Sequence, residues 1–222
     1  MNRNTSGKLT SKEIADLRRR YTRDGLREIE LPEDPVELFR SWLTEAVRSE
    51  VPEPNAMTLS TVDLAGNANS GTLLVNDIDD HPLSFYTNYR SVKADELEKN
   101  PSVCAVFWWP QLERQTRLRG TATKLPEEVN EEYFRSRPRE SKLGAWASNQ
   151  SSVINGRSDL EQKLEEVERT YENEEVPKPD YWGGYRVDLT EVEFWQGRPG
   201  RLHDRILYTF SKNNWKYVRL AP

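Results

Sequence analysis

The chain has 222 residues, of which 35% are hydrophobic and 31% charged, and its formal net charge is -5. This length is sufficient to bury a core, and 7 Trp, 9 Tyr and 6 Phe supply large apolar side chains, which argues against disorder. The negative charge argues against nucleic acid as a partner, because that role usually requires a basic face. Cys104 is the single cysteine, so no intrachain disulfide forms and a reducing, cytoplasmic location is expected.

Membrane and metal sites are also disfavoured by the sequence. The N-terminal residues contain no apolar secretory segment, and the longest apolar run, Val103–Trp109, is too short to span a bilayer. His81 and His203 are the two histidines, and with one cysteine they argue against a zinc site. No phosphate-binding glycine-rich loop is present. If the protein is an enzyme, a bound organic cofactor is expected to carry the chemistry.

The beginning of the chain is predicted to be helical. A capping-box pattern at Thr10–Glu13 predicts a short helix that reaches about Tyr21 and ends at Gly25. Asp34 is a good N-cap and Pro35 suits the first helical position, which predicts a second helix. Its apolar stripe indicates packing against a core and consists of Leu38, Phe39, Trp42, Leu43, Ala46 and Val47.

From residue 56 the hydrophobic period changes to two, which is typical of β-strands. A hairpin is predicted from strands 56–62 and 69–75, with further strands at 83–87, 103–109, 115–123, 185–189, 191–196, 206–211 and 215–220. Helices are predicted at 92–99, 126–133 and 158–171. Short strands with helices at the margins favour an α+β fold with an antiparallel β-barrel. We expect an N-terminal arm over residues 1–30 and one domain over 31–222.

Several separated sequence blocks carry functional information. Arg201, His203 and Arg205 lie within five residues at the start of a predicted strand, a pattern that a solvated strand edge would also explain. Other blocks are 85–88, 112–115, 133–141, 144–152, 194–197 and the terminal 219–222. Together these blocks resemble the pyridoxamine 5'-phosphate oxidase family from about Leu17 to Pro222.

The resemblance implies an FMN-binding split barrel with peripheral helices and a helical N-terminal arm. It implies a cytoplasmic homodimer with sites at the subunit interface, and a dimerisation region over residues 180–222. The implied reaction is the oxidation of pyridoxamine or pyridoxine 5'-phosphate to pyridoxal 5'-phosphate, with dioxygen reduced to hydrogen peroxide. No partner other than the second subunit and these small molecules is expected, neither nucleic acid nor membrane.

The same resemblance assigns roles to individual residues. Arg201 and His203 would lie against the substrate ring and the reacting carbon as catalytic residues. The substrate would be bound by these two residues together with Arg18, Tyr21, Tyr133, Arg137 and Ser141, the first two forming a lid. FMN would be bound by Tyr86, Thr87, Lys93, Gln115, Gln150, Ser151, Trp195 and Arg205.

Three basic residues of the family pattern are replaced in this chain. Gly71 and Val92 stand where arginines on the FMN phosphate are expected, and Asn76 stands where a lysine near flavin and substrate is expected. Their loss would weaken FMN binding by roughly 3–4 kcal/mol, or about a few hundred-fold. Three readings follow: a working oxidase, a vitamin B6 phosphate-binding dimer without flavin chemistry, or a flavin oxidase of another ring substrate, as in the phenazine-pathway relatives.

Overall fold

The structure is a computed structural model that describes residues 11, 14, 21–22, 25–78 and 83–222. The helix predicted from Thr10 to Tyr21 lies largely outside these residues. Arg18 and His81 lie outside them as well. From Gly25 onward, a single-turn helix η1 (Glu28–Glu30) leads into helix α2 (Pro35–Arg48).

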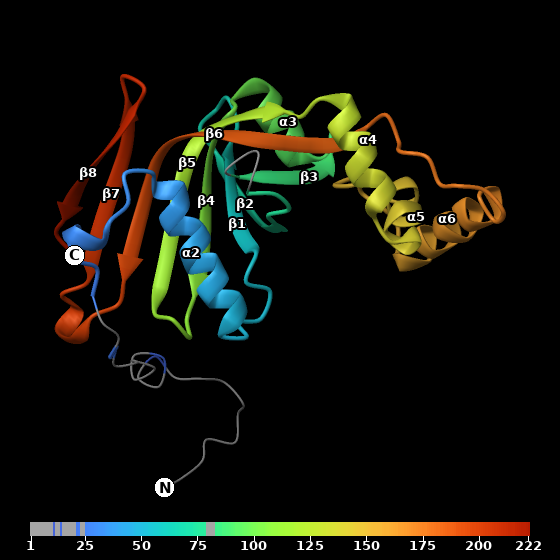
Figure 1. Cartoon of the computed structure of the whole chain (residues 1–222). Helices are drawn as coiled ribbons and strands as arrows, with labels where there is room; N and C mark the ends of the chain where they lie inside the picture. The colour runs from blue at the N-terminus through green and yellow to red at the C-terminus, as the bar shows by residue number, and fades with distance from the viewer. Residues whose placement is uncertain (1–10, 12–13, 15–20, 23–24, 79–82) are drawn as a thin grey trace, which may run out of the picture.

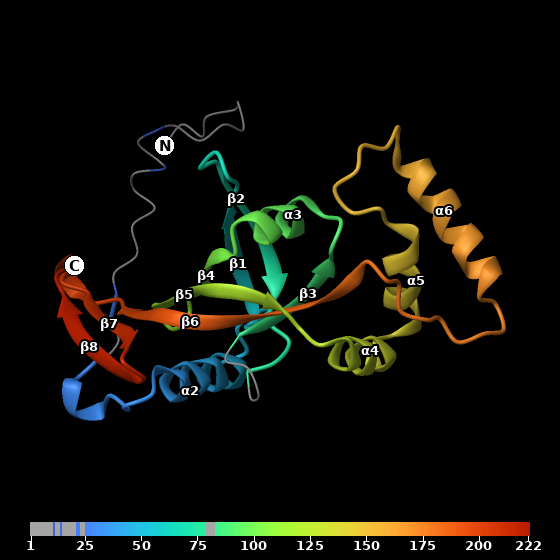
Figure 2. The same cartoon turned by 90° about the horizontal axis from the view of Figure 1, so that it is seen from above.

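Strands form one antiparallel sheet, in which eight are described, in the order β2-β1-β4-β5-β6-β7-β8, with β3 paired to β6. Their bounds are Ala56–Val62 (β1), Ala68–Leu74 (β2), Ser84–Asn88 (β3), Ser102–Trp109 (β4), Arg114–Lys124 (β5), Trp182–Gln196 (β6), Asp204–Ser211 (β7) and Asn214–Leu220 (β8). The long strand β6 crosses the molecule, from the helices α4–α6 at one end to β7 and β8 at the other (Figures 1 and 2).

Helices border this sheet. They are α3 (Val92–Lys99), α4 (Glu127–Ser136), α5 (Arg139–Ala147) and α6 (Arg157–Thr170), with a short turn η2 (Pro199–Arg201) before β7. Helix α2 begins as predicted, because the Asp34 carboxylate accepts a hydrogen bond from the Val36 amide at 2.9 Å and Pro35 occupies the first turn. No helix in the described part of the chain is long and apolar enough to cross a membrane.

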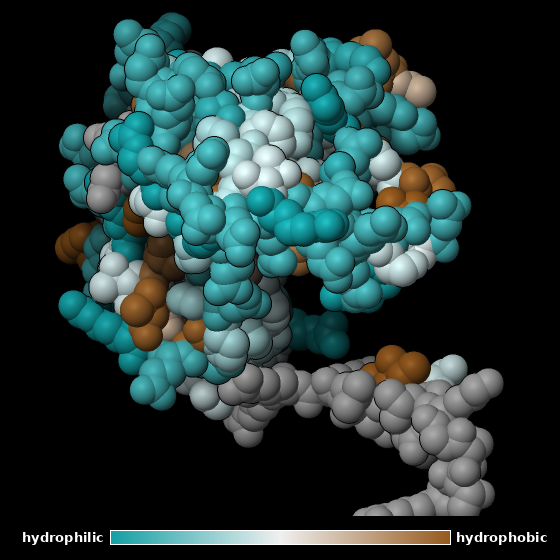
Figure 3. Space-filling view, turned by 90° about the vertical axis from the view of Figure 1, so that its right-hand side faces the viewer, coloured by the Kyte–Doolittle hydropathy of each residue, from teal (hydrophilic) through white to brown (hydrophobic). Residues whose placement is uncertain are grey.

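The core lies between α2 and the sheet. Phe39 packs on Phe107 with ring centroids 4.9 Å apart, and Trp42 meets Phe194 edge-on at 5.0 Å. Val47, predicted on this face, is instead 57% exposed. A small second cluster joins α5 and α6. Viewed from that end, the surface is mostly hydrophilic with separate small hydrophobic patches (Figure 3).

The predicted α+β fold with an antiparallel split barrel is confirmed: the described strands form one antiparallel sheet that does not close on itself, and two elements differ from the prediction. The strands predicted at 185–189 and 191–196 are one strand, β6. Its register against β5 shifts between Arg119 and Gly120, which pair with Glu191 and Leu189, so Thr190 is an extra residue. A bulge of this kind reverses the phase of the hydrophobic alternation, which explains the prediction of two strands. Helix α5 was not predicted.

Candidate functional site

The residues predicted to form the site lie in two groups at opposite ends of β6. The first group comes from β3, α3, α4, α5 and the loop after α5, and the second from β5, β6, η2 and β7. Tyr86 pairs with Gly184 near the start of β6, whereas Gln115 pairs with Trp195 near its end. At about 3.3 Å per residue, roughly 35 Å of strand separates Gly184 from Trp195.

An aromatic stack forms the wall of the first group. Tyr86 and Tyr133 lie parallel with centroids 3.8 Å apart, and Trp182 stacks on Tyr86 at 5.2 Å. The close approach depends on Gly184, because a Cβ atom there would lie 2.8 Å from the Tyr86 ring and 2.6 Å from Leu125. Sequence reasoning missed Trp182, whose only signal was its position after the proline-rich segment 177–179.

Arg137 is half-buried against these rings. Its guanidinium lies 4.6 Å from the centroid of Trp182 and 5.5 Å from that of Phe134. Burial lowers the pKa of Arg137, an effect that Tyr133 opposes. The Nη1 atom is buried and makes no hydrogen bond within the described part of the chain. Because buried donors are normally paired, this nitrogen marks a place for an anionic ligand.

Ser141 and Tyr133 complete a donor set around Arg137. Arg137 and Ser141 line a cavity of about 410 Å³ together with Tyr86, and a neighbouring cavity of about 420 Å³ also reaches Tyr133. The side-chain amide of Asn76 donates a hydrogen bond to the Tyr133 hydroxyl oxygen. That hydroxyl therefore retains its own proton for a ligand, and burial raises its pKa so that it stays protonated.

A chain of polar contacts runs from β3 to the loop after α5. The Lys93 ammonium donates to the Thr87 hydroxyl at 3.4 Å, and this hydroxyl donates to the Gln150 carbonyl at 3.3 Å. The Val92 amide donates to the Ser151 hydroxyl at 3.3 Å. Burial lowers the pKa of Lys93. The structure thus brings together the predicted FMN residues of the first group.

The second group forms a row across three strands. Gln115 on β5 pairs with Trp195 on β6, and Trp195 pairs with Arg205 on β7. Arg205 Nε donates to Glu193 Oε1 at 2.8 Å, and this bond raises the pKa of Arg205. Glu193 is buried and also pairs with Arg117. Sequence reasoning missed Glu193, because a lone carboxylate in a strand gives no signal of burial.

His203 lies in an aromatic cluster with Trp195 and Tyr21, at centroid distances of 4.6 and 5.6 Å. The Arg198 amide donates to Nδ1 of His203 at 3.1 Å, so a neutral ring carries its proton on Nε2. Burial and the nearby Arg201 lower the pKa of His203 and favour that neutral form. Arg201 is exposed and has a left-handed backbone, with φ of 63°.

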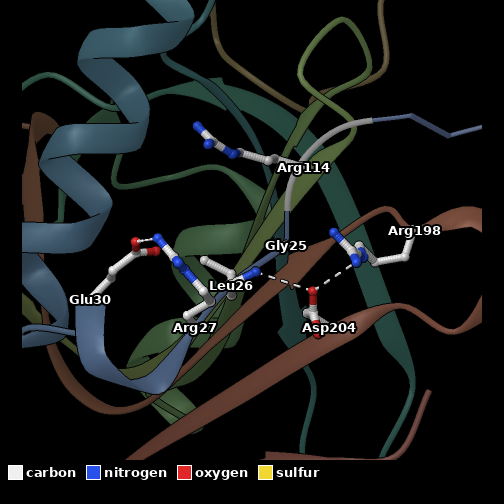
Figure 4. A pocket seen from close by; sticks show the side chains of 7 residues that line it. All are labelled: Gly25, Leu26, Arg27, Glu30, Arg114, Arg198 and Asp204. Atoms are coloured by element: carbon white, nitrogen blue, oxygen red, sulfur yellow. Dashed lines mark hydrogen bonds and ion pairs between the residues drawn. The ribbon is translucent and has the colours of Figure 1, made fainter.

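A separate cavity of about 680 Å³ lies beside this group, lined by Gly25, Leu26, Arg27, Glu30, Arg114, Arg198 and Asp204 (Figure 4). It contains none of the residues predicted for the site. Asp204 accepts from the Leu26 amide at 3.1 Å and pairs with Arg198 at 3.7 Å. Arg219 also pairs with Asp204, at 2.6 Å. The contact of Leu26 with Asp204 holds this part of the chain against β7.

The antiparallel sheet bordered by helices places the chain in the α+β class, and the solved structures that share its fold are of the split-barrel type. The PhzG protein of Burkholderia lata, solved with tetrahydrophenazine-1-carboxylic acid, superposes with a TM-score of 0.84 at 29% identity, over 90% of this chain and 98% of that one. A pyridoxamine 5'-phosphate oxidase-related, FMN-binding protein of Nostoc punctiforme shares the fold with a TM-score of 0.68 at 18% identity, over 86% of this chain and 100% of that one.

Sequence comparison defines the family. Residues 43–171 match the family described as pyridoxamine 5'-phosphate oxidase, and residues 182–222 match the pyridoxine 5'-phosphate oxidase C-terminal dimerisation region. The pyridoxine/pyridoxamine 5'-phosphate oxidase of Thermosynechococcus vestitus is 51% identical, over 94% of this chain and 99% of that protein. The protein of the same name from Salinibacter ruber is 49% identical, over 94% and 99%. The chain therefore belongs to the pyridoxamine 5'-phosphate oxidase family, and the resemblance found in its sequence is confirmed.

Proposed function

We propose that this protein is an FMN-dependent oxidase that converts pyridoxamine or pyridoxine 5'-phosphate to pyridoxal 5'-phosphate, and that it acts as a homodimer. Relatives named for these two substrates match nearly the whole chain at 48–51% identity. The structural observation that carries the proposal is the buried Nη1 of Arg137, which makes no hydrogen bond to any residue that the structure describes and lies in a donor set suited to a phosphate.

The first group of residues would bind the substrate phosphate. Arg137 offers a charged donor, and the hydroxyls of Tyr133 and Ser141 offer two neutral ones. Asn76 orients the Tyr133 hydroxyl through its hydrogen bond. The stacked rings beside Arg137 present an apolar surface that excludes water from one side of the ligand.

The cofactor would be held by both groups. Tyr86, Thr87, Lys93, Gln150 and Ser151 offer donors and an aromatic face in one protomer, and Gln115, Trp195 and Arg205 would complete the site from the second copy. Such a division is supported by the length of β6, which separates the two groups within one chain. Bound FMN would supply the two-electron oxidation of the substrate at its C4' carbon, with dioxygen as the final electron acceptor and hydrogen peroxide as its product.

Arg201 and His203 would act at the substrate ring. The neutral His203 ring is fixed by the Arg198 amide on one side, so its Nε2 proton is available to a ligand on the other. Arg201 adds a positive charge and further donors. Tyr21 packs edge-on against His203 and would cover the substrate, with Arg18 assigned the same lid role.

The test is direct. Purified dimer is mixed with FMN and pyridoxamine 5'-phosphate, and hydrogen peroxide and pyridoxal 5'-phosphate are measured together. Equal amounts of both products support the proposal. A folded dimer that binds pyridoxal 5'-phosphate but gives no peroxide would instead support the second hypothesis, a B6 phosphate-binding protein without flavin chemistry. The neutral residues Gly71, Asn76 and Val92 favour this alternative.

We further propose that residues 1–30 act as an arm over the site of a single domain, 31–222, in which 180–222 make dimer contacts. A cytoplasmic location is proposed as well. It is supported by the single free cysteine, Cys104, and by the metabolic role of the relatives.

A further inference from the structure

A cavity of about 200 Å³ opens beside the polar contacts of Lys93 and Ser151. Strands β1 and β2, the start of α3 and the loop after α5 line it, through Leu59, Thr61, Asn69, Ser70, Gly71, Leu73, Val92, Lys93 and Ser151. Gly71 and Val92, the two positions that lack an expected arginine, thus line the same cavity. Lys93 is the single cationic side chain among these lining residues.

The charge of Lys93 is offset by Glu96, which is buried one turn further along α3. The hydroxyl of Thr61 donates to the Glu96 carboxylate, and the Asn69 amide donates to it at 3.3 Å. Both of these donors line the cavity. The carboxylate also interacts with Lys93, whose pKa it raises against the effect of burial. The positive charge that the lining offers to an anion is therefore limited to Lys93, and Glu96 behind it offsets that charge in part.

Space does not explain the missing arginines. A Cβ atom built on Gly71 would have no other atom within 4 Å, and the Gly71 backbone is not left-handed. Val92 is 49% exposed at the start of α3. Both positions have room for a longer side chain. Steric limits therefore do not explain why this cavity lacks arginines.

The lining suits uncharged hydroxyl groups better than a phosphate dianion. Thr61, Asn69, Ser70 and Ser151 offer hydroxyls and an amide, which pair well with a polyol. A dianion would have to leave water for a wall with one cation and a nearby buried carboxylate, which is unfavourable. Lys93 and Ser151 connect the cavity to Thr87 and Gln150, so it continues the proposed flavin site.

We propose that this cavity receives the ribityl end of the flavin with little grip on its phosphate, so that the chain binds riboflavin about as tightly as FMN. Gly71, Val92 and Glu96 are the residues that set this selectivity. This inference rests on the proposed flavin function, and it specifies which forms of the flavin, riboflavin and FMN, the chain can bind.

Titration of the flavin-free dimer with riboflavin and with FMN, followed by quenching of flavin fluorescence, measures both dissociation constants. We expect them to agree within about tenfold, because Lys93, whose charge Glu96 offsets, is the single cationic lining residue that can distinguish the phosphate. FMN binding that is tighter than riboflavin binding by about 30-fold or more would overturn the inference and leave the flavin function intact. Failure of a folded dimer to bind either flavin would overturn both.

Variants locate the effect at this cavity. Gly71→Arg combined with Val92→Arg is expected to tighten FMN binding about 100-fold and to leave riboflavin binding unchanged, because two charge-assisted contacts are added. Glu96→Gln removes the charge that offsets Lys93. It is also expected to tighten FMN binding relative to riboflavin binding, but by a smaller factor than the double arginine variant. Val47→Arg, which adds a charge at an exposed position of α2 outside this cavity, serves as the control and should change neither. Equal binding of both flavins by the double arginine variant would place the phosphate elsewhere and contradict the proposal.

Discussion

Arg137 has a buried guanidinium nitrogen that no described residue hydrogen-bonds, and it has two aromatic neighbours. Arg137→Ala is expected to weaken binding of pyridoxal 5'-phosphate by about 10-fold or more, because a charge-assisted hydrogen bond is lost. Binding of unphosphorylated pyridoxal should change little. Calorimetric titration of both ligands measures the difference. Arg135→Ala, an exposed neighbour on α4, is the control, and an equal loss in that variant would mean that the effect is not specific to the phosphate.

His203 is expected to titrate at a lower pH than a free imidazole. Burial is the first cause of its lowered pKa, and the positive charge of Arg201 is the second. Both disfavour the protonated form, so the ring stays neutral down to a pH below its ordinary value of 6.5. NMR titration of the ring nitrogens tests this, with His81→Gln used for assignment. Arg201→Gln should move the pKa of His203 upward, and an unchanged value would show that Arg201 does not act on the ring.

The individual site residues could be predicted from the sequence only through the separated blocks that resemble the pyridoxamine 5'-phosphate oxidase family. Tyr133, Arg137 and Ser141 lie in one such block, and the structure places their side chains around neighbouring cavities. Trp182 and Glu193 were not accessible, because their importance comes from contacts with residues far away in the chain. Stacking of Trp182 on Tyr86 depends on the pairing of β3 with β6, which no local pattern encodes.

Elements with local signals were predicted well, and those set by pairing were not. The Asp34 cap fixed the start of α2, and the turn over 63–67 fixed the first hairpin, since both depend on neighbouring residues. The continuity of β6 depends instead on its partner strand β5, where the shift at Gly120 makes Thr190 an extra residue. Because a bulge reverses the alternation of apolar and polar residues, the sequence pattern at Thr190 is the same as that of a strand end.

Gly120→Ala is expected to destabilise the fold at this bulge. A Cβ atom at Gly120 would lie 2.2 Å from the backbone oxygen of Asp188, so the two strands would have to separate. We expect a loss of about 1–3 kcal/mol or more in the free energy of unfolding. Urea unfolding at fixed protein concentration measures it. Gly144→Ala on α5, where no atom lies within 4 Å, should instead be neutral or stabilising by about 0.5–1 kcal/mol. Equal stability of the two variants would contradict a tight bulge.

At the scale of the whole molecule, β6 holds the two groups of site residues apart. Tyr86 lies beside its beginning and Trp195 near its end, and the strand between them is rigidly paired with β5 along its length. A single chain therefore does not bring its own Arg137 to its own His203 without breaking the sheet. Residues 182–222, which carry all of the second group except Gln115 on β5, match a dimerisation region. Formation of the dimer is therefore expected to bring the two groups together and so complete the site.

A complementation experiment tests this shared site. Arg137→Ala impairs the first group and His203→Ala the second, so each homodimer should keep little activity when the substrate concentration is well below the KM of the parent. Mixed dimers formed by coexpression pair one intact first group with one intact second group, and they also contain one site that lacks both. Each mixed dimer has one working site of its two, so the purified mixed dimer should show about half of the parent activity. Peroxide release by the doubly tagged, copurified mixed dimer measures it. If the site were built within one chain, every site of the mixed dimer would lack one residue, and no activity would return.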